Sequence, residues 1–167
     1  LLKVKKAELK KKIRIKMDIY ISIFLAGVFT IFYLFLSMRV GYMRGSPVMK
    51  IFFKMEKNIS EEKLYRNIRA HGNFSEYVPI YLILIFLIEA SGSVSISYLI
   101  ITSIIFSYGR IAHAICFCFF DYNPFLRISG MITTYLGLLL LAIQAIYLGI
   151  LFYLEPEIIV PLRISTF

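Results

Sequence analysis

The stretch from Ile19 to Met38, IYISIFLAGVFTIFYLFLSM, holds no charged residue in its twenty positions. At about 1.5 Å of rise per residue, a helix of this length crosses a hydrocarbon core roughly 30 Å thick. The stretch is too long for the apolar core of a signal peptide and lacks a small-residue cleavage site, so we expect it to stay in the chain. It therefore predicts a membrane span.

Three further apolar stretches follow along the chain. The first of them, residues 77–88, is short unless its helix begins earlier, in the polar stretch 61–75. The next is interrupted by Arg110 and His113, and the last, residues 128–154, is uncharged throughout. Because helices satisfy their own backbone groups in lipid, we predict an all-α membrane protein, a four-transmembrane-helix bundle. The predicted spans are about 19–38, 70–90, 94–118 and 128–154.

The composition agrees with this fold class. The 167 residues are 59% hydrophobic and only 17% charged, whereas soluble domains carry about 25% charged residues. Such a chain is not expected to be disordered, a disulfide scaffold or an ordinary soluble enzyme, and its length allows one domain.

The positive charge is concentrated at the start of the chain. Residues 1–16 hold eight of the 19 basic residues and one acid, Glu8, so the formal charge of +9 falls to +2 for residues 17–167. This tail contains no aromatic residue, whereas surfaces that bind nucleic acids interleave basic with aromatic side chains. We therefore expect no nucleic-acid partner.

The loops predict the sidedness of the bundle. Residues 39–68 hold seven Lys and Arg, and residues 89–97 hold none, so the positive-inside rule predicts that the first link is cytoplasmic and both termini lie on the opposite side. The basic tail 1–16 would then be on the wrong side. We expect it to be an upstream extension, with the four-helix membrane domain in residues 17–167 and Met17 as the native start. The alternative is a basic arm on the membrane surface.

The stretch Arg66 to Pro79, RNIRAHGNFSEYVP, carries polar groups directly into an apolar helix. Ionisable groups at membrane depth are costly unless they face protein, water or a ligand, so a focused polar face predicts a binding site. The alternative is that Arg66, Arg69 and Glu76 neutralise one another between helices. At 100° per residue, an arc of about 100° contains Arg66, Arg69, Asn73, Glu76 and Tyr77.

Other spans add basic groups. Arg110 and His113 share a face of the third span, Arg39 ends the first, and Arg127 opens the fourth. Arg39 and Arg127 have a simpler interpretation, in which they reach lipid headgroups. We expect no metal site, because no carboxylate or second histidine stands three or four residues from His113. The spacing of Cys116 and Cys118 fits no zinc motif, and their apolar, aromatic surroundings predict that they are small buried side chains.

At these residues the sequence resembles the MAPEG family, the membrane-associated proteins in eicosanoid and glutathione metabolism. Residues 69–79 are similar to the family's run R-A-x-x-N-x-x-E-Y-x-P on its second helix, and the resemblance extends over residues 19–154. His71-Gly72-Asn73-Phe74 and His113-Ala114 are more similar to the bacterial branch, which favours a bacterial inner membrane over the endoplasmic reticulum.

The resemblance implies a homotrimer that binds glutathione between neighbouring subunits. Arg69, Asn73, Glu76 and Tyr77 would hold the tripeptide, and Arg39, Arg66 and Arg110 would complete a cationic pocket. Arg127 would stabilise the thiolate. His113 stands where leukotriene synthases have a ligand-binding tyrosine, and Phe117 falls about where a second would be, so the second substrate stays open.

The expected function is therefore a membrane-bound glutathione-dependent transferase or peroxidase. Its second substrate would be an apolar electrophile or a lipid hydroperoxide that arrives through the membrane lipids. Glutathione is expected as co-substrate, with no metal or organic cofactor. Two alternatives remain, a non-catalytic lipid-binding or scaffold member of the family, and a small transporter in which Arg110, His113 and Glu76 line a polar path.

Overall fold

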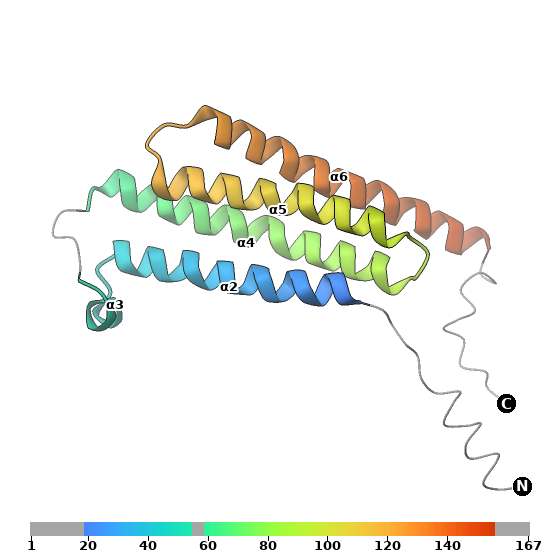
Figure 1. Ribbon diagram of the computed structural model, residues 1–167, viewed down its shortest axis with the longest axis horizontal. Helices are drawn as coiled ribbons and strands as arrows, with labels where there is room; N and C mark the ends of the chain where they lie inside the picture. The colour runs from blue at the N-terminus through green and yellow to red at the C-terminus, as the bar shows by residue number, and fades with distance from the viewer. Residues whose placement is uncertain (1–18, 55–58, 156–167) are drawn as a thin grey trace, which may run out of the picture.

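A computed structural model of the chain describes residues 19–54 and 59–155, and the basic tail 1–16 lies outside these residues. Four of its helices are long and apolar enough to cross a membrane. They lie alongside one another in alternating directions, which confirms the predicted four-helix bundle (Figure 1). The elements are α2 (Tyr20–Met43), the short α3 (Pro47–Phe52), α4 (Glu61–Ala90), α5 (Ile96–Phe119) and α6 (Pro124–Leu154).

Local sequence explains where the helices begin. Ser60, Ser95 and Asn123 each accept a hydrogen bond from a backbone N–H three residues later, at the starts of α4, α5 and α6. Such side-chain caps satisfy amide groups that have no partner within the helix. The polar stretch 61–75 is therefore part of α4, which begins well before the predicted span at about residue 70.

The two links next to Arg39, Arg66 and Arg127 lie at the same end of the bundle. The link from α2 to α4 and the link from α5 to α6 are together at the left of Figure 1, opposite the α4–α5 link. This arrangement agrees with the prediction that the basic link and Arg127 lie on the same side of the membrane.

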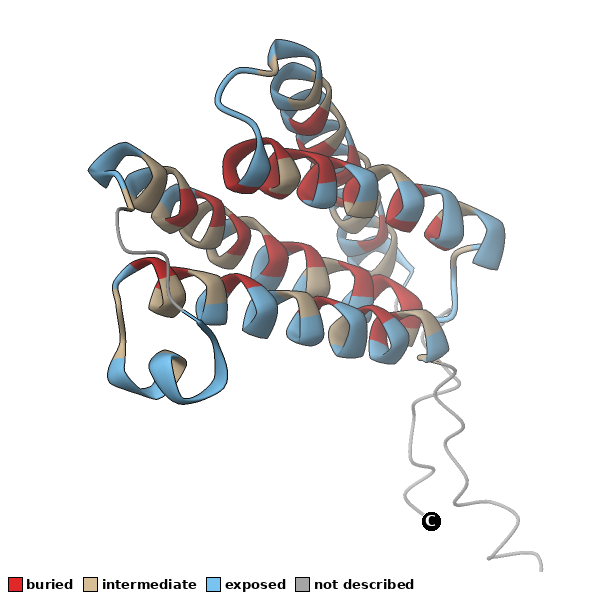
Figure 2. Cartoon of the chain, turned by 60° about the vertical axis from the view of Figure 1, so that its left-hand side comes forward, coloured by how far each residue is buried: buried red, intermediate tan, exposed pale blue. Residues whose placement is uncertain are grey.

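The core of the bundle surrounds α4, which packs against α2, α5 and α6. Buried residues lie on the faces that the helices turn toward one another (Figure 2). The rings of Tyr81 on α4 and Phe106 on α5 stack with their centroids 3.8 Å apart. Cys116 and Cys118 are buried and unpaired, as expected for small apolar side chains.

Glycines allow α5 and α6 to approach closely. A Cβ atom added at Gly137 of α6 would lie 2.9 Å from Cβ of Phe106, and one added at Gly109 of α5 would lie 2.6 Å from Oγ1 of Thr134. Small residues at helix interfaces in membranes permit this approach of backbones.

Gly137→Ala is therefore expected to destabilise the bundle by about 1–3 kcal/mol, because the backbones must separate to admit the methyl group. Thermal unfolding in detergent measures the effect. Gly149→Ala on the same helix is the matched control, since nothing lies within 4 Å of an added Cβ there. Equal melting temperatures for the two variants would contradict this packing.

Glu89 near the end of α4 stabilises the first turn of α2. Its carboxylate accepts hydrogen bonds from the backbone N–H groups of Ile21 and Ser22, at 2.9 and 2.8 Å, and from the Ser22 hydroxyl. A carboxylate at a helix N-terminus satisfies orphan donors and interacts favourably with the helix dipole.

Glu89→Ala should lower the free energy of unfolding by about 2 kcal/mol, because two buried donors and one partly buried donor lose their acceptor. Glu89→Gln, which keeps one acceptor oxygen, should lose less. Unfolding in detergent tests this order, with Glu155→Ala as the control at an exposed carboxylate. A Glu89→Ala melt equal to that of the control would be inconsistent with the cap.

Candidate functional site

A cavity of about 240 Å³ lies between α4, α5 and α6, toward the end of the bundle that holds the basic link. Each of these three helices contributes side chains to its wall. Six of the predicted site residues line it together, so side chains far apart in sequence meet at one place. The lining residues are Arg69, Asn73, Tyr77, Arg110, His113, Phe117, Arg127, Met131, Thr134 and Tyr135.

Helix α4 presents Arg69, Asn73 and Tyr77 to the cavity, since a spacing of four residues keeps side chains on one helix face. The Tyr77 hydroxyl lies 3.3 Å from that of Tyr135 on α6. The Arg69 guanidinium contacts Tyr65 one turn earlier, with Nη1 3.5 Å from the hydroxyl. Arg69 is exposed at the mouth of the cavity and makes no described ion pair.

Helix α5 contributes a buried arginine. Arg110 is 2% exposed, and its Nη1 donates one long hydrogen bond, 3.4 Å, to the carbonyl of Asn73. Its guanidinium carbon lies 4.9 Å from the centre of the Tyr77 ring. The Nε atom has no hydrogen-bond partner. A buried cation with so few partners is costly, and a charged ligand would supply what it lacks.

His113, one turn further along α5, is also buried and also has a nitrogen atom without a hydrogen-bond partner. It is 5% exposed, and its Nδ1 has no hydrogen-bond partner. Its ring lies 4.8 Å from that of Phe117. Arg110 and His113, one helical turn apart on the α5 wall of the cavity, thus each have a buried nitrogen atom without a hydrogen-bond partner.

Helix α6 begins at Pro124, and Arg127 lies in its first turn, with its guanidinium carbon 5.7 Å from the centre of the Phe117 ring. Met131, Thr134 and Tyr135 follow it along the cavity wall. Sequence reasoning missed these three residues. Their spacing from Arg127, at four, seven and eight residues, is the helical repeat that could have found them.

Arg39 and Arg66 were predicted to complete the pocket, but neither lines this cavity within the chain. Arg39 donates through Nε to Asn67 and through Nη2 to the carbonyl of Cys118, both at 2.6 Å. Arg66 donates to the carbonyls of Cys116, at 3.1 Å, and Phe120. Both guanidinium groups therefore join α5 to its neighbours by bonding carbonyls near the end of α5.

Glu76 was also predicted to be in the pocket. It is exposed on α4 and does not line the cavity of its own chain. The alternative in which Arg66, Arg69 and Glu76 neutralise one another is not observed, because among the described residues these three form no ion pair. Glu76 lies at one edge of the predicted polar arc, whereas the cavity-lining residues of α4 extend from beside it to the opposite edge, at Tyr77.

Residues 22–147 match the family model described as the MAPEG family, which covers most of the chain. The chain belongs to the MAPEG family. No curated protein and no solved structure matches it. Membership makes it an integral membrane protein of a glutathione-related transferase and peroxidase family.

A second cavity of about 280 Å³ adjoins the first in this MAPEG protein. The two share Phe117 and Arg127, so Arg127 stands between them. The second cavity lies at the link between α5 and α6 and has a mixed polar and apolar wall. It is lined by Arg66, Cys116, Phe117, Asp121, Tyr122, Asn123, Pro124, Arg127 and Ile128.

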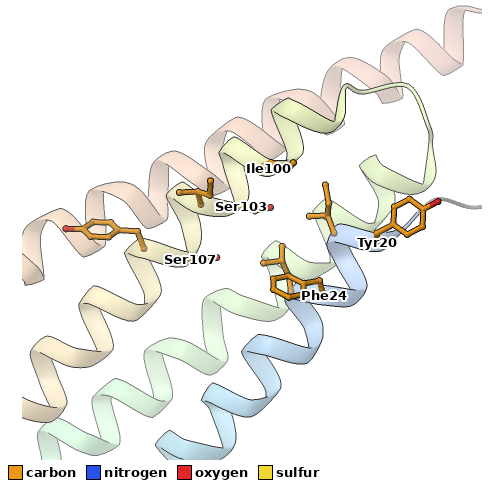
Figure 3. Close-up of a pocket in the computed structure, with 9 residues that line it drawn as sticks. Tyr20, Phe24, Ile100, Ser103 and Ser107 are labelled. Atoms are coloured by element: carbon orange, nitrogen blue, oxygen red, sulfur yellow. The ribbon is translucent and has the colours of Figure 1, made fainter.

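A larger groove of about 520 Å³ runs between α2 and α5, where Tyr20 and Phe24 lie across from Ile100, Ser103 and Ser107 (Figure 3). Its wall is almost entirely carbon and holds no Arg, Lys, Asp or Glu. It therefore offers no cationic group for the carboxylates of glutathione. Within residues 19–54 and 59–155, no three His, Cys, Asp or Glu side chains gather closely enough to hold a metal ion.

Proposed function

We propose that this MAPEG protein binds glutathione in the cavity between α4, α5 and α6 and uses its thiolate on an apolar electrophile or a lipid hydroperoxide. The observation that carries the proposal is the pair of buried nitrogens without partners, Nε of Arg110 and Nδ1 of His113, on residues that line the cavity. A charged peptide bound there would give them hydrogen-bond partners.

The charges of the wall agree with this ligand. Arg69, Arg110 and Arg127 line the cavity, and none of the other lining residues is a carboxylate. Glutathione carries two carboxylates, which arginine binds in a bidentate fork. The ammonium group of glutathione also requires a carboxylate with which to form an ion pair. Glu76, exposed on α4, would supply it from the edge of the site, within the homotrimer that the family resemblance implies.

Arg127 would act on the thiol. A free thiol has a pKa near 8.5, and an adjacent cation lowers that pKa, so that more of the nucleophilic thiolate is present at neutral pH. In a transferase reaction the sulfur forms a bond to carbon and displaces the leaving group. In a peroxidase reaction two glutathione molecules are oxidised to the disulfide while the hydroperoxide is reduced to an alcohol and water.

The second cavity would hold the part of the second substrate nearest the thiolate, because it meets the first at Arg127. Ile128→Trp should fill it and raise KM for the second substrate, while the Kd of glutathione stays unchanged. Ile132→Trp, one turn further on α6 and outside both cavities, is the matched control. An unchanged KM in Ile128→Trp would contradict this assignment.

Turnover by the detergent-purified protein tests the proposed activity, with aryl halides and hydroperoxides as second substrates. We expect glutathione-dependent product with members of one class. Glutathione binding without any turnover would instead favour the non-catalytic alternative. The transporter alternative requires flux across sealed vesicles that changes at Glu76 or Arg110, and no observation favours it.

The membrane proposed for this protein is a bacterial inner membrane. The support is the resemblance of His71-Gly72-Asn73-Phe74 and His113-Ala114 to the bacterial branch of the family.

A further inference from the structure

The short helix α3, in the link between α2 and α4, stands apart from the bundle. In Figure 1 it is seen end-on beside the end of α2, whereas the four long helices run across the view. Since those helices cross the membrane, α3 lies along the membrane surface. Figure 2 shows it as largely exposed and separate from the buried core.

Local contacts hold this segment against the end of α2. Gly45 adopts a φ of +68°, which turns the chain, and Pro47 is the first residue of α3. The ring of Tyr42 meets that of Phe53 edge-on, with centroids 6.3 Å apart. The Tyr42 hydroxyl also donates to the carbonyl of Lys54, at 3.3 Å. The segment is thus positioned by α2.

The surface of the segment is apolar and basic. Val48, Ile51 and Phe52 are 55%, 78% and 72% exposed, which is unusual for large apolar side chains outside a lipid-facing span. Arg44, Lys50 and Lys54 are exposed around them, and residues 40–54 contain no acid. Exposed apolar groups together with lysine and arginine are typical of segments that lie in the headgroup region of a membrane.

We propose that α3 and its flanks form an anionic-lipid anchor, which we define as Arg44, Val48, Lys50, Ile51, Phe52 and Lys54. The apolar side chains enter the boundary between headgroups and acyl chains, and the three basic side chains bind phosphate-bearing anionic headgroups. Sidedness agrees with this occupant, since the positive-inside rule places this link at the cytoplasmic leaflet, whose anionic lipids attract basic residues. The proposal does not depend on glutathione chemistry.

A single tryptophan tests the anchor, because the chain has none. Phe52→Trp is placed in nanodiscs of phosphatidylcholine, with or without phosphatidylglycerol, and its emission and quenching by brominated acyl chains are recorded. We expect phosphatidylglycerol to increase the quenching, since each basic residue near an anionic surface strengthens binding of the segment about fivefold. Adding Lys50→Glu and Lys54→Glu should remove the increase.

Tyr153→Trp, 85% exposed at the opposite end of the bundle, is the control and should not respond to phosphatidylglycerol or to the two charge reversals. Val48→Trp replaces Phe52→Trp if the latter elutes as an aggregate. Emission typical of water, or a blue shift without quenching, would overturn the proposal, the second because it indicates a protein partner. Quenching that does not change with headgroup charge, or with Lys50→Glu and Lys54→Glu, would also overturn the proposal.

Discussion

Arg127→Ala should abolish the near-ultraviolet absorbance that a glutathione thiolate gives when it binds at neutral pH, and should lower turnover by about 10²–10³-fold. Removal of one group that stabilises a developing or bound anion typically has an effect of this size. Glutathione binding should remain largely intact, because Arg69 and Arg110 still face the carboxylates. Difference spectra and equilibrium binding on the same preparation measure the two effects.

Arg69→Ala is the matched variant, since Arg69 is also an exposed arginine of the same cavity. It should weaken glutathione binding itself and leave a thiolate signal at saturating glutathione. Arg127→Lys, which keeps a positive charge, should recover part of the signal. Equal loss of binding in Arg127→Ala and Arg69→Ala would mean that the two roles are assigned wrongly.

Arg110→Met should weaken glutathione binding by about 30-fold or more, because truncating one partner of a buried charge pair costs about 2–5 kcal/mol. The same change should leave the melting temperature of the ligand-free protein unchanged or raise it. Arg110 is 2% exposed with an unpartnered Nε and no described ion pair, so its burial is costly until a ligand binds. Methionine occupies similar space without a charge to desolvate.

Weaker glutathione binding together with an unchanged or higher melting temperature distinguishes an arginine that binds the ligand from one that stabilises the fold. Thermal melts with and without glutathione measure both in one experiment. A large drop in the ligand-free melting temperature of Arg110→Met would show that the guanidinium stabilises the fold, and would contradict its assignment to the ligand.

The sequence predicted the bundle because uncharged stretches such as residues 19–38 leave few alternatives in a membrane. It also predicted most of the cavity wall, since Arg69, Asn73 and Tyr77 repeat at a helical spacing and Arg110 and His113 share a face of α5. These features depend on local periodicity. Local periodicity can be read without knowing how the helices pack.

The parts that the sequence did not predict depend on packing between helices. The resemblance put Arg39 and Arg66 in the pocket, and no local pattern predicted that carbonyl groups near the end of α5 would accept hydrogen bonds from both of them. The helical repeat from Arg127 includes Tyr135, but the proximity of its hydroxyl to that of Tyr77 follows from the packing of α6 against α4. The cap that Glu89 provides to α2 joins residues 67 and 68 positions apart, which no local pattern indicates.

The most direct test is equilibrium binding of labelled glutathione to the detergent-purified protein, with Arg110→Met beside it. We expect saturable binding to the wild-type protein that an S-alkyl glutathione displaces and that Arg110→Met weakens by about 30-fold or more. Absence of saturable binding, or the same affinity in Arg110→Met, would contradict the claim that this cavity binds glutathione.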